Sequence, residues 1–446
     1  MERRLPDGVF YSMEDTIFAP STALGGAIAV IRISGQEADR IASVLDRPLP
    51  AEASRTRFAR IMDGEEPLDD IMLTRFIAPK SYTGENMIEI SCHGGYQTVQ
   101  RILGLLSRLG FRPAEGGEFT KRAFLNGKMD LSQAEAVMDI ITADAEQSRK
   151  AALNQLHGSV STAIHKVEQL LLDALSGIDA AIDFPDEAEQ DCVEMLPRQF
   201  GEAEKEIERL IRDGRLGRVL RDGLSVVIMG KPNVGKSSLM NAMIGTDRAI
   251  VTEIAGTTRD VLDERTSFNG VPVRLIDTAG IHDTEDLVET IGINRAIEQL
   301  ERADVILTVF DSSRDLDEDD IRLIEKAEQA RAFIIVSNKS DLKEISKRDD
   351  AVRVSAMTGE GIQELKKRIL DMTSPGDADN VCITNERHLH ALERALDALR
   401  HGKKEKELDC IATDIREALH ELGSITGSDV DADVIDRIFE RFCVGK

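Results

Sequence analysis

The chain of 446 residues contains no tryptophan, and aromatic residues make up only 4% of it. A surface that stacks single-stranded bases needs several aromatic side chains, so this composition argues against such a surface as the main function. Acidic residues exceed basic ones and give a formal net charge of −25. A protein that grips nucleic acid through phosphates is basic, at least locally. If RNA is a substrate, we therefore expect another subunit to supply much of the grip.

Cysteine pairs and long apolar runs are also missing. The five cysteines are scattered, and none forms a Cys-x-x-Cys pair. This pattern argues against a disulfide framework or structural zinc and fits a reducing compartment. No apolar run reaches the length of about 18 residues that is typical of a membrane span, and the N-terminus lacks the apolar stretch of a secretory signal. We therefore predict a multidomain cytoplasmic protein without membrane contact.

What the sequence does contain is a phosphate-binding loop. Residues 230–237 read Gly-Lys-Pro-Asn-Val-Gly-Lys-Ser and match the spacing G-x-x-x-x-G-K-[ST]. An apolar, β-branched run at 224–229 precedes the loop, and a helical pattern at 238–244 follows it. A strand, glycine loop and helix N-terminus in this order present backbone N–H groups to a polyphosphate. We expect Lys236 to reach the terminal phosphates as a catalytic residue, and Ser237 to bind Mg²⁺.

Three further motifs follow in the order of a small GTPase domain. Asp277-Thr-Ala-Gly280 follows a strand pattern, and its ends are suited to hold Mg²⁺ and to sense a γ-phosphate. In Asn338-Lys-Ser-Asp341, the Asp341 carboxylate can accept both N–H donors of guanine, which rejects adenine. Ser355-Ala356 resembles the backbone contact to guanine O6. Together the motifs predict GTP as the nucleotide.

A threonine-rich segment between these motifs, Gly256-Thr-Thr-Arg-Asp260, is a candidate switch. Thr258 is the candidate second Mg²⁺ ligand, with Thr257 as its neighbour; a solvated turn is the alternative. The predicted GTP contacts are Asn233, Val234, Gly235, Lys236, Ser237, Ser238, Thr252, Glu253, Ile254, Ala255, Gly256, Thr257, Thr258, Asp277, Thr278, Ala279, Gly280, Asn338, Lys339, Asp341, Ser355 and Ala356.

The segments before and after this GTPase segment have different secondary-structure patterns. Residues 16–127 have an α+β pattern, and long helical patterns follow, among them 131–157 and 196–220. Helical patterns resume after the Ser374-Pro-Gly376 linker. We predict a multidomain α/β and α protein. The N-terminal α+β domain covers residues 1–127. A helical domain is split into residues 128–222 and 374–446. Between its two parts lies an inserted Ras-like P-loop GTPase domain, residues 223–373, with a mostly parallel sheet.

Short signatures extend over nearly the whole chain. They are Asp15-Thr-Ile17, Arg32-Ile-Ser-Gly35, Ser81-Tyr-Thr-Gly-Glu85, His93-Gly-Gly95, Gly117-Glu-Phe-Thr120, Arg122-Ala-Phe-Leu-Asn126, Asp130-Leu-Ser-Gln-Ala-Glu135 and Phe442-Cys-Val-Gly-Lys446. With the GTPase motifs, they resemble the MnmE (TrmE) family of bacterial tRNA-modification GTPases, within the TrmE-Era-EngA-YihA-Septin-like class. One departure is Ser21-Thr-Ala-Leu-Gly-Gly26, where the family has a Pro-Gly-Arg-Gly-Gly-like turn that bears on folate or dimer contacts.

The resemblance implies a homodimer formed through an N-terminal domain similar to tetrahydrofolate-binding folds. It also implies a heterotetramer with the flavoprotein MnmG (GidA), which carries the FAD. Together they would add an aminomethyl or carboxymethylaminomethyl group at C5 of the wobble uridine of certain tRNAs. A tetrahydrofolate derivative, 5-formyl- or methylene-tetrahydrofolate, would supply the carbon. By motif, Arg32, Glu89 and Lys128 line the folate pocket and Lys446 reaches it; without the resemblance, the first three are ordinary charges.

The family also implies how hydrolysis proceeds. Ile281 stands where other GTPases orient water with glutamine. The resemblance implies that Glu289 holds the water instead; a surface glutamate is the alternative. It further implies a K⁺ ion, bound when two GTPase domains meet, with the ligands Asn233, Thr252, Ile254 and Thr257.

Cys443 has competing interpretations. Its sequence context does not fit prenylation. A catalytic thiolate and a buried structural cysteine both remain, and composition favours the buried one. Two other functions also compete with the family assignment: a ribosome-assembly GTPase, and a non-catalytic scaffold that uses GTP as a switch.

Overall fold

The computed structural model describes residues 15–245, 263–277, 303–330, 332–372 and 383–446. Its contacts divide the chain into two compact units, residues 1–138 with 423–446, and residues 139–422. The four-segment division made from sequence stays a prediction. Among the described residues, the helices are all too short or too polar to cross a lipid bilayer.

The first unit contains a six-stranded sheet in the order β3-β4-β5-β2-β1-β6. Its strands are β1 (Ile17–Pro20), β2 (Ile28–Ser34), β3 (Arg55–Asp63), β4 (Glu66–Phe76), β5 (Met87–His93) and β6 (Arg112–Pro113). Neighbouring strands are antiparallel except β1 and β6. Alternate residues such as Ile31 and Ile90 join one buried cluster with Val99 and Ile102 of α1 (Tyr96–Arg108), and with η1 (Ala38–Val44). Arg32 follows Ile31 and Glu89 precedes Ile90, so this opposed pair belongs to the other face of the sheet.

The C-terminal segment packs onto helices of the same unit. These helices are α2 (Glu118–Leu125), the first part of α3 (Leu131–Thr142) and α13 (Ala432–Phe439). Phe124, Phe439 and Phe442 form a chain of aromatic contacts, with centroids 6.4 and 5.1 Å apart, beside Leu131 and Ala134. This cluster brings the C-terminal residues to the N-terminal sheet.

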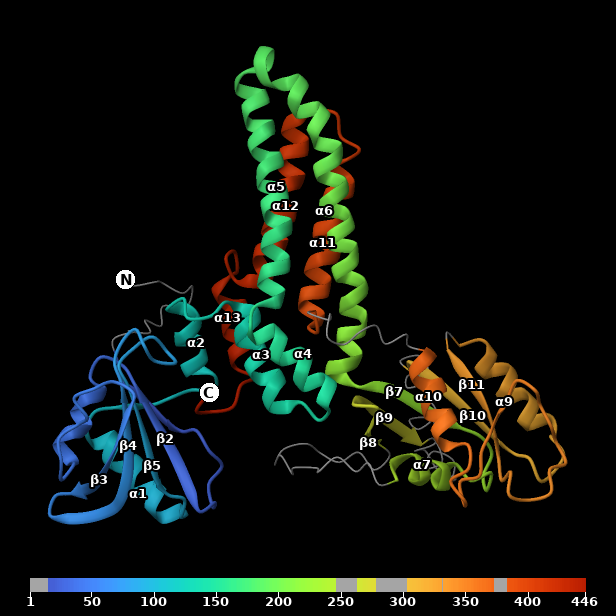
Figure 1. Cartoon of the computed structure of the whole chain (residues 1–446), viewed down its shortest axis with the longest axis horizontal. Coiled ribbons are helices and arrows are strands. Elements are labelled where there is room, and N and C mark those ends of the chain that lie inside the picture. Colours follow the sequence, from blue (N-terminus) through green and yellow to red (C-terminus); the bar gives the residue numbers. More distant parts are fainter. Residues whose placement is uncertain (1–14, 246–262, 278–302, 331, 373–382) are drawn as a thin grey trace, which may run out of the picture. The chain divides into compact units, whose positions relative to one another are not determined.

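Long helices form much of the second unit: α4 (Glu146–Leu156), α5 (Ser159–Asp183), α6 (Pro185–Asp222), α11 (Glu386–Gly402) and α12 (Leu408–Thr426). α5 buries residues at three- and four-residue spacing, and α5, α6, α11 and α12 run alongside one another (Figure 1). The helix predicted at 131–157 is wrong, because α3 ends at Thr142 and α4 begins at Glu146. Ala145 is extended between them, at φ −137° and ψ 152°.

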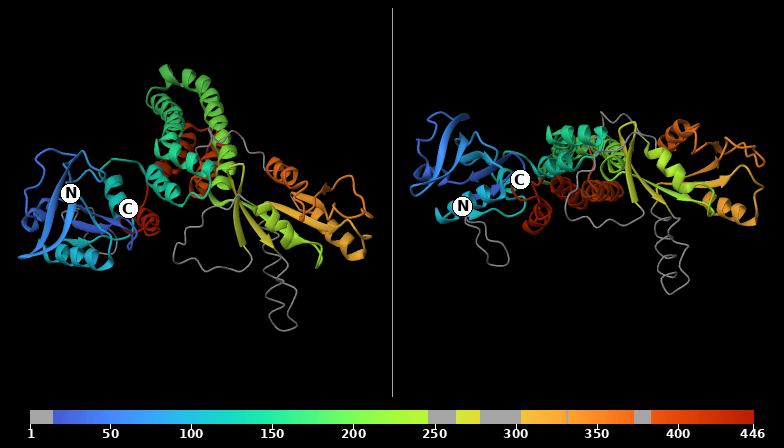
Figure 2. Two further views of the ribbon diagram at one scale, coloured as in Figure 1. Left: turned by 60° about the horizontal axis from the view of Figure 1, so that its bottom comes forward. Right: turned by 90° about the horizontal axis from the view of Figure 1, so that it is seen from below.

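The second sheet has the order β12-β11-β10-β7-β9-β8. Its strands are β7 (Leu224–Met229), β8 (Asp263–Phe268), β9 (Val271–Asp277), β10 (Val305–Asp311), β11 (Phe333–Asn338) and β12 (Val352–Arg353). All neighbouring pairs are parallel except β8 and β9. Helices α7 (Lys236–Ile244), α9 (Glu318–Glu328) and α10 (Ile362–Met372) flank this sheet (Figure 2).

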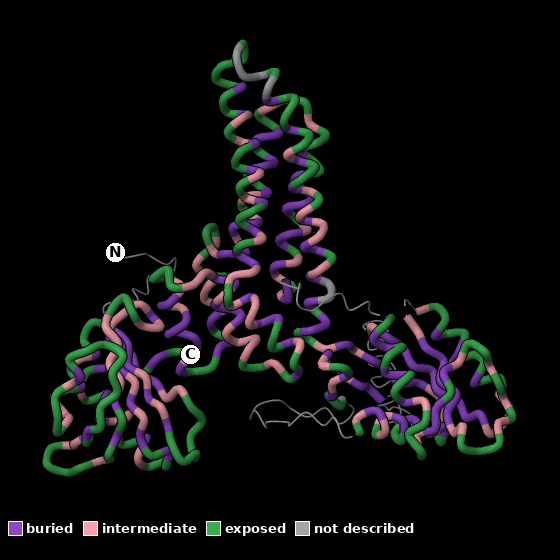
Figure 3. Tube along the Cα trace, in the orientation of Figure 1, coloured by how far each residue is buried: buried purple, intermediate pink, exposed green. Residues whose placement is uncertain are grey.

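Both faces of the second sheet are covered. Leu307 and Val309 of β10 belong to the cluster that holds α7 and α10 residues, whereas Phe310 packs with Ile324 of α9. A strand buried on both faces reads as a continuous apolar run, and β10 is buried throughout (Figure 3). This two-sided burial fixes the carboxyl ends of β7, β10 and β11, where the functional loops begin.

Candidate functional site

The loop between β7 and α7 has the backbone that a phosphate-binding loop requires. Gly230 has φ +153°, and a Cβ there would lie 2.3 Å from the Val309 carbonyl oxygen. Gly235 has φ +94°, and its Cβ would lie 2.4 Å from Nδ2 of Asn338. Asn233 also has a positive φ, 65°, which asparagine tolerates better than most residues. The two glycines therefore permit a close approach that any side chain would block.

Lys236 and Ser237 are the first two residues of α7; Lys236 is buried and Ser237 is exposed. Lys236 is only 6% exposed, and its Nζ donates to the carbonyls of Gly230 and Lys231, both at 2.9 Å. Burial lowers the pKa of Lys236, although the charge of Asp277 opposes this effect. Ser237 is exposed, and its Oγ donates to Oδ2 of Asp277 at 2.9 Å. A hydroxyl and a carboxylate are the oxygen ligands that Mg²⁺ prefers, so this pair fits the ion.

Asn338 joins the phosphate loop to the guanine motifs. It is 1% exposed; its Nδ2 donates to the Val234 carbonyl at 2.9 Å, and its Oδ1 accepts the Ala356 N–H at 3.1 Å. Ser355 Oγ donates to Oδ1 of the exposed Asp341 at 2.5 Å. The predicted phosphate and guanine residues therefore share one hydrogen-bonded edge of the sheet.

Sequence reasoning missed one member of this edge. Asp311 ends β10, and its Oδ2 accepts Nζ of Lys339 at 2.6 Å. Burial raises the pKa of Asp311, but hydrogen bonds from Lys339 and Ser313 outweigh this effect and lower it. Lys339 has a positive φ of 66°, and this ion pair holds its side chain. The available signal was an aspartate at the carboxyl end of a buried strand.

Several predicted residues lie outside the described part of the chain. They are Thr252, Glu253, Ile254, Ala255, Gly256, Thr257, Thr258, Thr278, Ala279, Gly280, Ile281 and Glu289. Their predicted roles in Mg²⁺, K⁺ and water binding stay predictions.

The first unit brings the C-terminal tail to the Arg32 and Glu89 pair. Nε and Nη2 of Arg32 donate to Oε1 of Glu89 at 3.0 and 2.8 Å, and its guanidinium lies 5.1 Å from the Tyr82 ring centroid. The Gly445 carbonyl accepts Ser21 Oγ at 3.1 Å and Arg32 Nη1 at 3.5 Å. The turn at Ser21, whose sequence differs from the family pattern, thus contacts the tail.

Lys128 and Lys446 differ in where they lie. Lys446 is half-buried and directly follows Gly445 at the Arg32 contact. Lys128 is exposed, and its Nζ donates to the Pro79 carbonyl at 2.9 Å. Three of the four predicted folate residues are therefore brought together, whereas Nζ of Lys128 contacts the Pro79 carbonyl in another loop.

Cys443 is exposed, so the buried structural cysteine that composition favoured is wrong. The reason is the extended backbone at this point. Val444 forms a β-bridge with Gly116, and the Gly117 N–H donates to the Cys443 carbonyl at 3.3 Å. Phe442 enters the aromatic cluster, and the next side chain points away from it.

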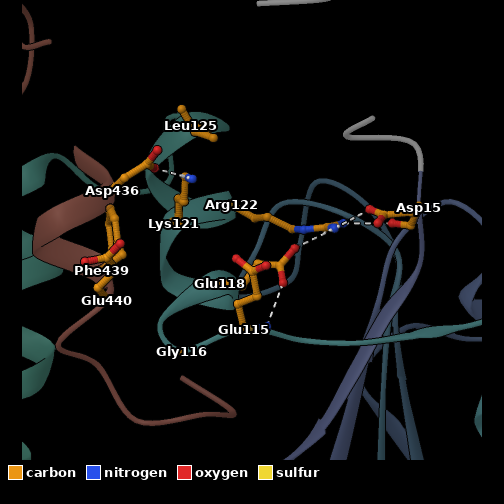
Figure 4. A pocket seen from close by; sticks show the side chains of 10 residues that line it. All are labelled: Asp15, Glu115, Gly116, Glu118, Lys121, Arg122, Leu125, Asp436, Phe439 and Glu440. Atoms are coloured by element: carbon orange, nitrogen blue, oxygen red, sulfur yellow. Dashed lines mark hydrogen bonds and ion pairs between the residues drawn. The ribbon is translucent and has the colours of Figure 1, made fainter. Parts of the chain in front are cut away.

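A buried ion network near the tail also escaped sequence reasoning. Arg122 is 5% exposed and donates to Oδ1 of Asp15 at 2.6 Å, to Glu118 at 3.1 Å and to Glu85 at 3.2 Å. Burial opposes ionisation of Asp15 and Glu118, but the neighbouring arginines outweigh it and lower the pKa of both. Figure 4 shows Arg122 reaching Asp15 beside a cavity of about 140 Å³. The network ties α2 to the start of β1.

A mostly parallel sheet with this phosphate loop, the Ser237 and Asp277 pair and the guanine motif defines a P-loop GTPase, an enzyme that hydrolyses GTP. The model of the MnmE helical domain matches residues 131–443, and that of the GTP-binding protein TrmE N-terminus matches residues 16–128. The chain therefore belongs to the MnmE family.

Two relatives with the family's name match the chain over nearly its whole length. The tRNA modification GTPase MnmE of Alkaliphilus oremlandii is 43% identical and covers 97% of this chain and 100% of its own length. The protein of the same name from Bacillus subtilis is 40% identical with the same coverage. The solved G domain of the T. maritima FeoB iron transporter is 29% identical, covers 34% of this chain and 99% of its own, and has a TM-score of 0.27.

Proposed function

We propose that this chain couples GTP hydrolysis to the modification of tRNA. The specific reaction is addition of an aminomethyl or carboxymethylaminomethyl group at C5 of the wobble uridine, with a flavoprotein partner of the MnmG type. The observation that carries the proposal is the coexistence of a GTPase site and an N-terminal sheet whose Arg32 contacts the chain's own C-terminal tail. A ribosome-assembly GTPase or a scaffold gives no reason for the second feature.

The residues around Arg32 and Glu89 are suited to a tetrahydrofolate derivative. The Glu89 carboxylate offers an acceptor for pterin N–H groups, and Arg32 holds that carboxylate through two hydrogen bonds. The exposed Lys128 offers a cation for the glutamyl carboxylates. Tyr82 lies beside the Arg32 guanidinium and is partly buried, which adds an aromatic surface. When bound, the folate would supply a one-carbon unit; Arg32 would orient it and hold the tail nearby. We place Lys446 in the same proposed folate site, and Lys128 at its edge.

A homodimer through the N-terminal domain completes the proposal, with a heterotetramer that includes the flavoprotein. The net charge of −25 favours a partner that supplies most of the tRNA grip. We propose that the chain is divided into the four segments predicted from the sequence, with the N-terminal segment forming the homodimer. Cys443 is exposed in the tail, so its side chain is accessible to serve as a nucleophile.

Potassium is expected to stimulate hydrolysis. Asn233 is exposed in the phosphate loop and is free to offer an amide oxygen to K⁺, joined by Thr252, Ile254 and Thr257. A cation at a site of developing charge contributes about 10²-fold to a rate, so hydrolysis should be faster in K⁺ than in Na⁺ by about that factor. Asn233→Ala should abolish the difference, whereas Asn241→Ala, an exposed asparagine of α7, should not. Equal rates in both salts would reject the K⁺ site.

Glu289 is expected to hold the attacking water. Glu289→Ala should leave GTP binding almost intact and slow turnover by about 10²-fold, as for other groups that orient a nucleophile. Single-turnover hydrolysis at saturating K⁺ measures this step, and Glu289→Gln tests whether a polar group suffices. Normal single-turnover rates in the alanine variant would remove the role.

A further inference from the structure

The β8–β9 hairpin connects two parts of the predicted nucleotide site. β8 begins at Asp263, just after the predicted switch segment, and β9 ends at Asp277, which accepts Ser237 Oγ. The turn between them is Asn269-Gly270, with φ +49° and +80°. Two positive φ values are typical of the tight turn that joins antiparallel strands directly. One short strand therefore joins the turn to Asp277, the predicted Mg²⁺ carboxylate.

The turn is bound by α4, which lies outside the sheet. The Gly270 carbonyl accepts the backbone N–H of Gln147 at 3.1 Å, and the Asn269 carbonyl accepts Nε2 of Gln147 at 2.8 Å. The Cγ of Gln147 lies 3.4 Å from the position of a Cβ on Gly270, so the contact is close. Gln147 thus binds both residues of the turn, Asn269 through its side chain and Gly270 through its backbone N–H.

This contact also completes the helix. α4 begins at Glu146, and its N-cap, Ala145, makes no side-chain capping hydrogen bond. The first N–H groups of a helix have no partner within it, and the N–H of Gln147 is one of them. The hairpin carbonyl supplies that partner. The position of the hairpin and the order of the first turn of α4 therefore depend on each other.

The other contacts of α4 anchor it to the long helices. Ser148 Oγ donates to the Leu220 carbonyl at 2.5 Å, near the end of α6. Ala151 is fully buried in the cluster that contains Leu220 and Leu224. Gln155 accepts Thr384 Oγ1 at 3.0 Å, just before α11. The hairpin tip is thus fastened to an element that is itself packed against α6 and the segment before α11.

We propose that Gln147 is a positioning residue for GTP hydrolysis. It fixes the hairpin turn and, through β9, the Asp277 carboxylate beside Ser237. In the other direction, it transmits the state of the nucleotide site to the first turn of α4 and so to the helices. The inference depends on GTP hydrolysis alone and is independent of the folate and tRNA proposals.

The test is Gln147→Met, which keeps size and helix propensity but removes the donor to Asn269. The loss of one hydrogen bond that matters for the reaction lowers a rate constant by about threefold to tenfold. We expect kcat to fall by that factor, the Mg²⁺ concentration for half-maximal hydrolysis to rise similarly, and GTP affinity to change less than twofold. Glu146→Gln is the matched control, because Glu146 is exposed and pairs with Arg149. A purely structural role would leave the Mg²⁺ requirement unchanged.

Hydrogen exchange supplies the second measurement. Amides in the first turn of α4 should exchange at different rates in the wild-type protein with GDP and with a non-hydrolysable GTP analogue, and Gln147→Met should reduce that difference. Unchanged kcat and Mg²⁺ requirement in a folded variant would overturn the proposal. If the variant fails to fold, the wild-type protein decides: equal exchange in both nucleotide states would overturn it.

Discussion

Asp341→Asn is expected to lower the affinity for GTP by about 10³-fold. Asp341 is exposed at the end of the guanine motif, and Ser355 Oγ orients its carboxylate at 2.5 Å. Guanine presents two N–H donors on this edge, and a carboxylate accepts both. An asparagine amide would place its own N–H group against one of them, and sites built on such hydrogen bonds discriminate by about 10⁴-fold when a partner is lost. Some of this loss is recovered through the phosphate contacts, which remain.

Equilibrium binding of GTP and xanthosine triphosphate measures the effect. Xanthine carries a carbonyl in place of the guanine amino group, so the asparagine variant should bind xanthosine triphosphate more tightly than GTP. The neighbouring Asp349→Asn is the control, because Asp349 is an exposed aspartate outside the motif. Unchanged preference for GTP in the Asp341 variant would show that the base is read elsewhere.

Deletion of Cys443–Lys446 is expected to abolish tRNA modification while leaving K⁺-stimulated GTP hydrolysis intact. The tail contacts Gly116, Ser21 and Arg32, all in the first unit. The described nucleotide residues all belong to the second unit. The two activities should therefore fail independently. The paired measurement is hydrolysis by the purified variant beside mass spectrometry of tRNA from cells that express it.

A single substitution sharpens this test. Gly445 has φ +93°, and a Cβ there would lie 2.1 Å from the Pro20 carbonyl oxygen. Gly445→Ala should therefore displace the tail without removing its chemical groups, and reduce modification as the deletion does. Arg441→Ala, at an exposed position before the tail, is the control. Fully modified tRNA from the truncated protein would make the tail dispensable, and loss of both activities would indicate a folding defect.

The predictions that the structure confirms come from contiguous motifs. The spacing of residues 230–237 predicts a strand, loop and helix. Asp277 and Asn338 each end a buried strand, so parallel pairing brings them to one edge of the sheet. The multidomain α/β and α fold class followed from the same patterns together with the family resemblance.

What sequence reasoning missed depends on contacts between distant residues. The break at Ala145 has no glycine or proline to signal it; there the Gly270 carbonyl caps a helix start from far along the chain. Exposure of Cys443 accompanies the bridge between Val444 and Gly116. The buried Arg122 pairs with Asp15 and Glu85 on distant segments, besides Glu118 of its own helix. Hydrophobic periodicity carries no trace of such pairings.

The central claim is that this GTPase modifies the wobble uridine of tRNA. Its most direct test is nucleoside analysis by mass spectrometry of tRNA from cells that lack the protein, beside cells in which the wild-type chain is restored. We predict loss of aminomethyl-type groups at C5 of the wobble uridine in the first and their return in the second. Unchanged wobble uridines in cells that lack the protein would contradict the claim.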